Sequence, residues 1–208
     1  MEDPALTTLR AVRPGEVGDL AALLTRAFAA DSVLDWFLRP WSRRRAAELF
    51  FARVVADALP FGGVRVDAGF SACAVWLPPG AEPAAGGVWA GLGNTLWMLR
   101  VASPLRLSRL EAVMRTSAEI HPKEKCYYLS FIGTLPEARG GGLASDLIGE
   151  TLSQADADGV PAFLETADAA KVGYYQRFGF ELTGQAQLPL GGPALNLMWR
   201  EPHSSRLL

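Results

Sequence analysis

The chain has 208 residues, half of them apolar and a fifth charged, which fits one globular domain over the whole sequence. A net charge of -2 provides no overall basic field, so we expect neither a nucleic-acid binder nor a membrane-bound protein. Cys73 and Cys126 lack metal-ligand spacing, and we expect free buried thiols, a cytoplasmic location and no metal site.

The N-terminal part reads as a short strand followed by helices. Residues 7–12 form the strand candidate, and apolar residues at helical spacing predict helices over 16–28, 31–40 and 42–59. Asp31 or Ser32 suits the cap of the second helix. We interpret Arg43–Arg45 as the solvated first turn of the helix over 42–59.

The middle of the chain predicts two strands and two further helices. Residues 62–79 read as two strands around a tight turn at 67–69. Helices are expected over 82–100, where glycines weaken the pattern, and over 103–121, where Ser103 would cap and Pro104 suits the first helical position. Trp89, Leu92, Leu96 and Leu99 would share a face of the first of these helices. We expect these helices to close over a cleft.

The C-terminal part alternates strands with helices. Residues 124–135 form a strand candidate with few charged side chains, which predicts a central strand buried on both faces. Then come a helix over 145–159, a strand over 160–166, a helix over 168–178 and strands over 180–188 and 194–200. Alternation in the strand over 180–188 places on one face Phe180, Leu182, Ala186 and Leu188. The interleaved elements predict a mixed α/β sheet with helices on both sides.

Three consecutive glycines stand between the central strand and the next helix, at 140–142. The first N–H groups of a helix have no internal partner, and glycines let an anion approach them closely. A diphosphate suits this chemistry. The Lys-Ser/Thr of a P-loop and the spacing of a dinucleotide fingerprint are both missing. A plain flexible turn is the alternative.

The segment "LPEARGGGLASDLI" resembles the acyl-CoA-binding motif of the GNAT superfamily of N-acetyltransferases. Its three defined places are filled by Arg139, Gly142 and Ala144. The segment "YYQRFGFEL" resembles the Tyr-x-x-x-Gly-Phe segment of the same superfamily through Tyr175, Gly179 and Phe180. This resemblance implies a mixed, mostly antiparallel central sheet flanked by helices on both faces. Acceptor-side helices would occupy about 16–120, and an acyl-CoA-binding core about 124–200.

A closer resemblance, to puromycin N-acetyltransferase-like proteins, covers the runs 121–148 and 159–180. Those proteins usually carry Lys or Arg where Gly141 stands, and Asn where Lys171 stands. The first departure removes a charged contact near the cofactor phosphates. The second changes a contact with the pantetheine arm or the substrate.

The resemblance implies direct acyl transfer from acetyl-CoA, as co-substrate, to the amine of a small molecule. Main-chain N–H groups around the glycines would hold the pyrophosphate, and the exit of the central strand would face the pantetheine arm and the thioester. The implied cofactor-binding residues are Ile132, Gly133, Thr134, Arg139, Gly140, Gly141, Gly142, Leu143, Ala144, Ser145 and Lys171.

Two residues are the candidate catalytic groups. Tyr175 suits a general acid for the departing thiolate, because the proton moves uphill by only about 1.5 pKa units, or about 2 kcal/mol. The alternative is that Tyr174 and Tyr175 both pack in the core. Glu165 suits a general base, with an exposed charge or a salt bridge as the alternative. An α-amine of pKa about 8 would make a base dispensable. Asp168 suits a helix cap and His121 the surface.

Acceptor recognition would use an aromatic ring with a carboxylate, a pair that attracts a cationic amine. The candidates are Asp31, Trp36, Trp76 and Tyr127, with core packing as the alternative for each aromatic ring. A small-molecule N-acetyltransferase of antibiotic-like or natural-product amines is the leading hypothesis. A protein or peptide N-terminal acetyltransferase and a non-catalytic acyl-CoA sensor are the others, and a homodimer is left open.

Overall fold

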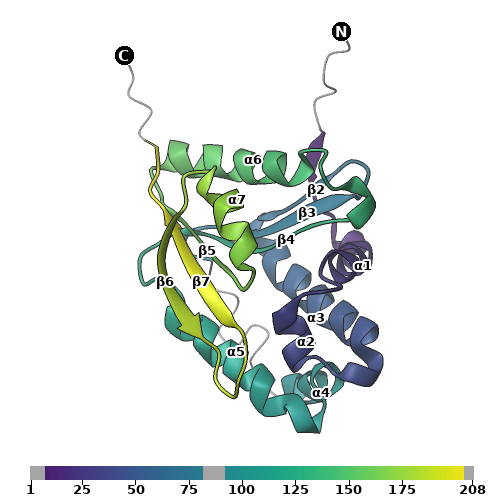
Figure 1. Ribbon diagram of the computed structural model, residues 1–208. Helices are drawn as coiled ribbons and strands as arrows, with labels where there is room; N and C mark the ends of the chain where they lie inside the picture. The colour runs from purple at the N-terminus through teal and green to yellow at the C-terminus, as the bar shows by residue number, and fades with distance from the viewer. Residues whose placement is uncertain (1–7, 82–91, 204–208) are drawn as a thin grey trace, which may run out of the picture.

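A computed structural model describes residues 8–81 and 92–203 of the chain (Figure 1). Seven strands form one sheet in the order β1-β2-β3-β4-β5-β7-β6. Only β4 and β5 pair in parallel, because α6 crosses over between them; the other neighbours are antiparallel. The strands are β1 (Leu9–Ala11), β2 (Val64–Asp67), β3 (Ala72–Leu77), β4 (Tyr127–Thr134), β5 (Ala162–Thr166), β6 (Glu181–Gln187) and β7 (Ala194–Arg200). The predicted mixed, mostly antiparallel sheet with β4 at its centre is confirmed.

Helices cover both faces of this sheet, as predicted (Figure 1). On one side lie α6 (Leu143–Asp158) and α7 (Val172–Gln176). On the other lie α1 (Val17–Ala27), α2 (Ser32–Phe37), α3 (Arg43–Ala58), α4 (Leu92–Val101) and α5 (Leu107–Ile120). Among the described helices, none combines the length and the apolar character needed to cross a bilayer.

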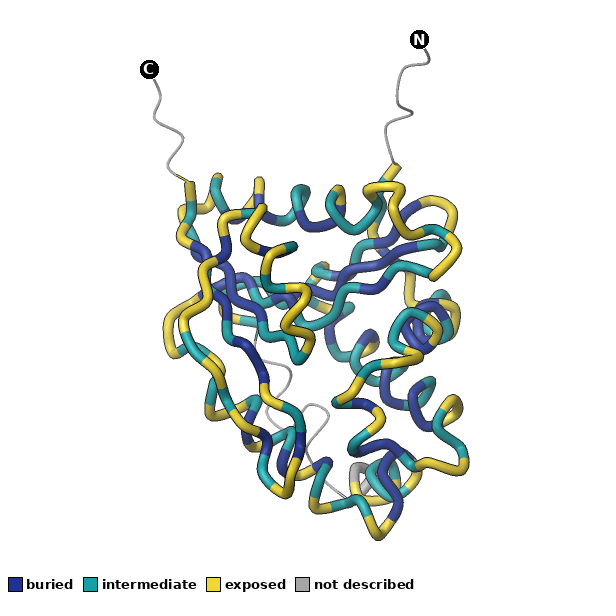
Figure 2. Tube along the Cα trace, viewed as in Figure 1, coloured by how far each residue is buried: buried dark blue, intermediate teal, exposed yellow. Residues whose placement is uncertain are grey.

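The period of two along the strands builds two separate cores. In β3, Cys73 and Val75 join the core under α1 and α3, while Ala74 and Trp76 join the core under α6. Figure 2 shows the buried trace following the central strands and the inner sides of the helices. The two cysteines are free and buried, as expected from their apolar surroundings.

Three predictions about surface and caps are wrong. Arg44 and Arg45 are exposed as expected, but the Arg43 side chain is only 24% exposed, because its guanidinium pairs with Asp35 and donates to the carbonyl of Phe28 at 2.9 Å. The Ser103 hydroxyl caps nothing, because it is buried without a partner and Pro104 opens a 3-10 turn that precedes α5. Leu182 is 47% exposed, because the ladder between β6 and β7 shifts register just after it.

The expected helix over 82–100 is described only from residue 92, so its first part, with Trp89, lies outside the described residues. Within α4, Leu96 is exposed, whereas Trp97 and Met98 pack against the core. The Trp97 indole also donates to the carbonyl of Leu49 in α3 at 3.2 Å. The packing face of α4 is therefore offset by one residue from the predicted face.

A buried arginine joins the end of α6 to β7 and to the loop after α7. Arg200 is 3% exposed and donates to both carboxylate oxygens of Asp156 at 2.8 Å. It also donates to the Phe178 carbonyl at 2.8 Å, next to Gly179, whose φ is +86°. This guanidinium lowers the pKa of Asp156. The network therefore holds the segment after α7 against the sheet.

Replacing Arg200 by Ala should lower the free energy of unfolding by about 3 kcal/mol, because the Asp156 carboxylate loses its charged partner in a largely buried site. Urea denaturation at pH 7 measures this. The matched control is Arg44→Ala, which removes an exposed pair with Glu48 and should cost less than about 0.5 kcal/mol.

The pKa shift fixes how this loss depends on pH. Because the folded-state pKa of Asp156 is lowered, the stabilisation exists above the ordinary Asp value and is lost as pH falls through the folded value. The free energies of unfolding of the wild type and Arg200→Ala should therefore converge at low pH. Equal losses for Arg200→Ala and Arg44→Ala at pH 7 would contradict this account.

Candidate active site

The central feature of the site is the point where β4 parts from β5. The two strands pair only over Tyr127–Leu129 and Ala162–Leu164. In the ladder with β3, Ser130 is skipped: Trp76 stands opposite Leu129, and Val75 opposite Phe131. This bulge turns β4 away from β5, and in Figure 1 β5 and β7 descend away from β2–β4. Beyond Leu129, β4 therefore pairs with β3 alone.

The exit of β4 leaves some main-chain groups facing this gap. The Leu135 N–H donates to the Ser71 carbonyl at 2.8 Å, on the β3 side. Because successive residues of a strand turn their N–H and C=O to opposite sides, Gly133 faces β3, and Ile132 and Thr134 face the gap. The backbone of Ile132 and Thr134 is thus free to hydrogen-bond a guest.

Gly133 has a packing role of its own. It stands opposite Cys73 in the ladder with β3. A Cβ at Gly133 would lie 2.8 Å from the Cβ of Ala27 and 3.1 Å from a methyl group of Leu24, both in α1. The glycine therefore lets α1 lie close against the sheet.

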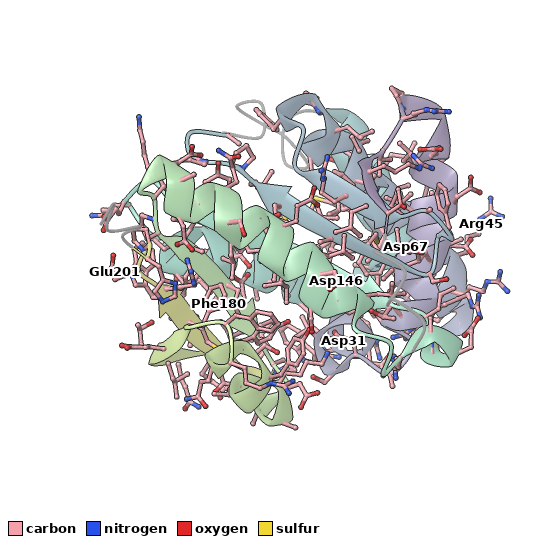
Figure 3. The ribbon with its side chains drawn as sticks, turned by 90° about the horizontal axis from the view of Figure 1, so that it is seen from above. Asp31, Arg45, Asp67, Asp146, Phe180 and Glu201 are labelled. Atoms are coloured by element: carbon pink, nitrogen blue, oxygen red, sulfur yellow. The ribbon has the colours of Figure 1, made fainter. Side chains whose placement is uncertain are left out.

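The glycine turn leaves the start of α6 open. Gly142 is the N-cap, with φ +85° and no capping side chain. The helical ladder starts at the Asp146 N–H, which donates to the Gly142 carbonyl at 3.0 Å, so the three preceding amides have no partner in it. A Cβ at Gly140 or Gly142 would meet nothing within 4 Å. Figure 3 shows α6 crossing the sheet from its Asp146 end.

This geometry fits a bound anion. Leu143, Ala144 and Ser145 carry the three free amides at the positive end of a helix of 16 residues. Gly140 also has a positive φ, of +84°, which residues with side chains rarely adopt. The Arg139 side chain is exposed and donates to the Ala27 carbonyl at 3.2 Å. The turn can therefore take a diphosphate such as that of coenzyme A.

Of the two neighbouring tyrosines in α7, Tyr175 is the more buried. It is 6% exposed, its ring centroid lies 6.3 Å from that of Phe180, and burial raises its pKa well above 10. Its hydroxyl bonds no described residue. The Tyr174 hydroxyl, by contrast, lies 3.2 Å from Ser145 Oγ in the first turn of α6. Tyr175 therefore keeps a free, protonated hydroxyl at neutral pH.

Glu165 is neither an exposed charge nor a salt-bridge partner. Its Oε1 accepts a hydrogen bond from the Tyr128 hydroxyl at 2.6 Å, and its Oε2 is buried without a partner among the described residues. Burial raises its pKa to about 7, against the opposing effect of the Tyr128 hydrogen bond. A carboxyl group with this pKa exchanges a proton readily near neutrality.

Tyr128 was missed by the sequence reasoning, which chose Tyr127. The two lie on opposite faces of β4. The Tyr127 hydroxyl donates to Asp158 of α6 at 2.5 Å, and Trp76 is 1% exposed in the core under the same helix. Trp76 and Tyr127 therefore pack in the core on the α6 side of the sheet, which is the alternative that the sequence left open for each ring. Period-two alternation could have separated Tyr127 from Tyr128, but it does not say which faces the site.

Asp31 and Trp36 lie together at α2, with structural roles of their own. Asp31 caps α2 by accepting from the Leu34 N–H at 2.9 Å, and burial raises its pKa. The Trp36 ring packs against the β6–β7 turn, where a Cβ at Gly192 would lie 2.9 Å from it. The Arg109 guanidinium lies 5.6 Å from the centroid of the Trp36 ring.

Lys171 lies beside α1, where its Nζ is 5.9 Å from the centroid of the Phe28 ring. Its charge opposes the rise in the pKa of Asp31 that burial causes. Asp168 caps the turn before α7 by accepting from the Ala170 N–H at 3.0 Å, as expected. His121 is exposed, as expected, and its ring centroid lies 5.1 Å from that of Tyr128.

Residues 120–183 match the family model described as an acetyltransferase (GNAT) domain. The matched segment is shorter than half of the chain and contains both motifs on which the resemblance rested. The GNAT resemblance of this segment is confirmed.

Solved structures of acetyltransferases share the whole architecture. One is a structure from Corynebacterium glutamicum described as "histone acetyltransferase HPA2 and related acetyltransferase". It is 20% identical to this chain with a TM-score of 0.69, and the match covers 97% of this chain and 99% of the other. A polyamine N-acetyltransferase of Drosophila melanogaster is 18% identical with a TM-score of 0.59, covering 93% and 99%. Arylalkylamine N-acetyltransferase 2 of Aedes aegypti is 11% identical with a TM-score of 0.60, covering 95% and 100%. The chain has the GNAT fold, and the domain match with this fold supports an N-acetyltransferase.

The raised pKa of Glu165 predicts a pH-dependent cost in stability. The folded protein holds this proton up to about pH 7, whereas an unfolded Glu loses it near 4.3, so stability falls as pH rises between these values and levels off above. Glu165→Gln should remove about 2 kcal/mol of the loss between pH 5 and pH 8, measured by urea denaturation. The control is Glu119→Gln, in an exposed pair with Arg115. If the free energy of unfolding changes with pH in the same way for Glu165→Gln and the wild type, the Glu165 carboxyl group does not have a raised pKa in the folded protein.

Proposed function

We propose that the protein is an acetyl-CoA-dependent N-acetyltransferase that acts on the amine of a small molecule. One observation carries the proposal: the open amides at the start of α6 and the bulged exit of β4 lie at one end of a gap in the sheet, and the buried carboxyl group of Glu165 lies at the other. The first two can hold a thioester cofactor, and the third can accept a proton.

The main chain would bind the cofactor. The amides of Leu143–Ser145, with those of the glycine turn, would hold the pyrophosphate, and the gap-facing backbone of Ile132 and Thr134 would hold the pantetheine arm and orient the thioester carbonyl. Acetyl-CoA supplies the acetyl group and a thiolate leaving group. Since these contacts need no particular side chain, the sequence can vary here as long as the glycines stay.

Two side chains would move protons. Glu165 would take a proton from the acceptor ammonium, because a carboxyl group with a pKa of about 7 is partly ionised at neutral pH and can accept one. Tyr175 would give its proton to the departing thiolate, because its hydroxyl is protonated and bonds no described side chain; since burial raises its pKa, this transfer is further uphill than for a free tyrosine. Lys171 and Asp31 would meet the acceptor, since Lys171 lies over the Phe28 ring and close enough to Asp31 for its charge to act on that carboxyl group.

The acceptor class is the least constrained part of the proposal. Structural neighbours are named for polyamine and arylalkylamine substrates, which supports a small primary amine. The resemblance to puromycin N-acetyltransferase-like proteins adds antibiotic-like and natural-product amines to the candidates. Asp31 and Trp36, both at α2, are the pair that would suit a cationic acceptor.

Thiol release from acetyl-CoA against puromycin, aminoglycosides, polyamines, arylalkylamines and short peptides tests this function. We expect release with at least one small amine, and a loss of about 100-fold in kcat/KM for Glu165→Gln. Release with peptides alone would favour a protein N-terminal acetyltransferase. Tight cofactor binding without release from any amine would make the protein an acyl-CoA sensor.

A charge at Gly141 should weaken cofactor binding. Its φ lies outside the left-handed region, and a Cβ would meet only the Ala138 carbonyl oxygen at 3.6 Å, so side chains fit without strain. Gly141→Asp should weaken coenzyme A binding about tenfold in calorimetry, through repulsion of the phosphates. The isosteric control Gly141→Asn should bind nearly as the wild type. If Asp and Asn bind equally well, the phosphates lie elsewhere.

The two tyrosines of α7 should differ in their effect on turnover. Tyr175→Phe should lower kcat about 100-fold, because the thiolate then leaves without a general acid, with little change in the KM for acetyl-CoA. Tyr174→Phe loses only the contact with Ser145 Oγ and should stay within about threefold of the wild type. Steady-state kinetics at pH 7.5 compares them, and the opposite ranking would assign the acid to Tyr174.

A further inference from the structure

Tyr128 and Glu165 meet where the two central strands part. Tyr128 stands opposite Phe163 in the parallel ladder, and Leu129 opposite Leu164 is the last pair. Glu165 follows immediately, so its side chain lies at the mouth of the gap, on the same face as Tyr128. The 2.6 Å hydrogen bond between their side chains spans the two strands at this point.

This hydrogen bond makes the two carboxylate oxygens unequal. Oε1 is taken by the Tyr128 hydroxyl, while Oε2 is buried and bonds no described residue. Buried polar atoms in folded proteins nearly always have partners, and an open one beside a substrate gap is suited to a donor that the substrate brings. The Tyr128 bond also fixes which oxygen remains open.

The other groups around the pair are mostly uncharged at neutral pH. Cys126, which acts on Tyr128, stays a neutral thiol because burial raises its pKa to about 11. On β4, the Ser130 hydroxyl acts on Tyr128 and lowers its pKa, against the stronger raising effects of burial and Glu165. Just after α5, the ring of His121 packs edge-on against the rings of Tyr128 and Phe163, and this partial burial of a largely exposed residue lowers the His121 pKa. On β7, the residue opposite Glu165 is the apolar Leu197. None of these groups replaces the hydrogen bond that Tyr128 donates to the carboxylate.

We propose that Tyr128 is a positioning residue that holds Glu165 by Oε1 and presents Oε2 to the acceptor amine, an inference that rests on the proposed function. The step is a proton transfer: an N–H bond of the acceptor ammonium breaks, an Oε2–H bond forms, and the neutral amine is left with the electron pair that attacks the acetyl carbonyl. Tyr128 keeps its own proton throughout. Removing the Tyr128 hydroxyl should therefore change both the pH at which Glu165 ionises and the orientation of its carboxylate.

Tyr128→Phe and Tyr127→Phe form a matched pair, because the same atom is removed from adjacent residues on opposite faces of β4. In Tyr128→Phe, the carboxylate loses a stabilising hydrogen bond, so the acid-side midpoint of the kcat/KM profile should rise by about one pH unit. Activity at pH 6 should fall about tenfold and recover partly at pH 9. Tyr127→Phe removes a bond to Asp158 and should leave the midpoint unchanged. Equal midpoints in both variants would overturn the proposal.

A double-mutant cycle with Glu165→Gln separates positioning from a general loss of structure. If Tyr128 acts through Glu165, the double variant should be no less active than Glu165→Gln alone. Multiplying losses would mean that Tyr128 acts independently, which contradicts the proposal. If Tyr128→Phe does not fold, Glu165→Asp repeats the test, because it keeps the charge but withdraws it from the Tyr128 hydroxyl; activity equal to the wild type would then overturn the inference.

A carbon NMR titration of the Glu165 carboxyl needs no turnover. The pKa should rise by about one unit in Tyr128→Phe and stay in place in Tyr127→Phe. A protein that shows this shift but acetylates no amine would disprove the proposed function while keeping Tyr128 as the group that orients the carboxyl. If the Glu165 carboxyl group titrates identically in the wild type, Tyr128→Phe and Tyr127→Phe, the positioning role of Tyr128 is refuted, even if the enzyme is active.

Discussion

The separation of β4 from β5 after Leu129 is the constraint on which the rest of the site depends. A sheet that stayed paired to its end would satisfy every main-chain group of β4 and leave no opening at its centre. The bulge at Ser130 prevents this, and the parallel arrangement gives the two strand ends the same direction. The gap-facing backbone of β4, the first turn of α6 and the side chain of Glu165 therefore border one gap in the sheet, although they come from three separate elements of the chain.

Much of the fold was predictable because its signals are local. Helical spacing of apolar residues predicted α1, α3 and α5, and the low charge of residues 124–135 identified β4 as the central strand. The helix predicted over 145–159 ends at Gly159, whose φ is +64°. The errors arose where the outcome depends on distant partners. Arg43 finds Asp35 only once α2 and α3 fold against each other, and the register shift that exposes Leu182 depends on pairing with β7.

The candidate site divides in the same way. The glycine turn is a local device, so its place at the start of α6 followed from the sequence. The Tyr128–Glu165 pair depends on the register of two parallel strands, and no spacing along the chain encodes that register. Trp76 and Tyr127 were candidates for their aromatic rings, and alternation along a strand separates two faces without telling which one faces the acceptor. Lys171 was placed by resemblance at the pantetheine arm or the substrate, and its contact with Phe28 depends on how α7 folds against α1.

An amide NMR titration with coenzyme A tests the central claim most directly, because it reads the main-chain groups themselves and requires no acceptor. The account predicts the largest shifts at the amides of 140–145, followed by Ile132 and Thr134 on the gap side of β4, with Gly133 moving less than these two. Saturable binding that leaves the start of α6 unchanged and shifts amides elsewhere would show that the cofactor binds at a different surface.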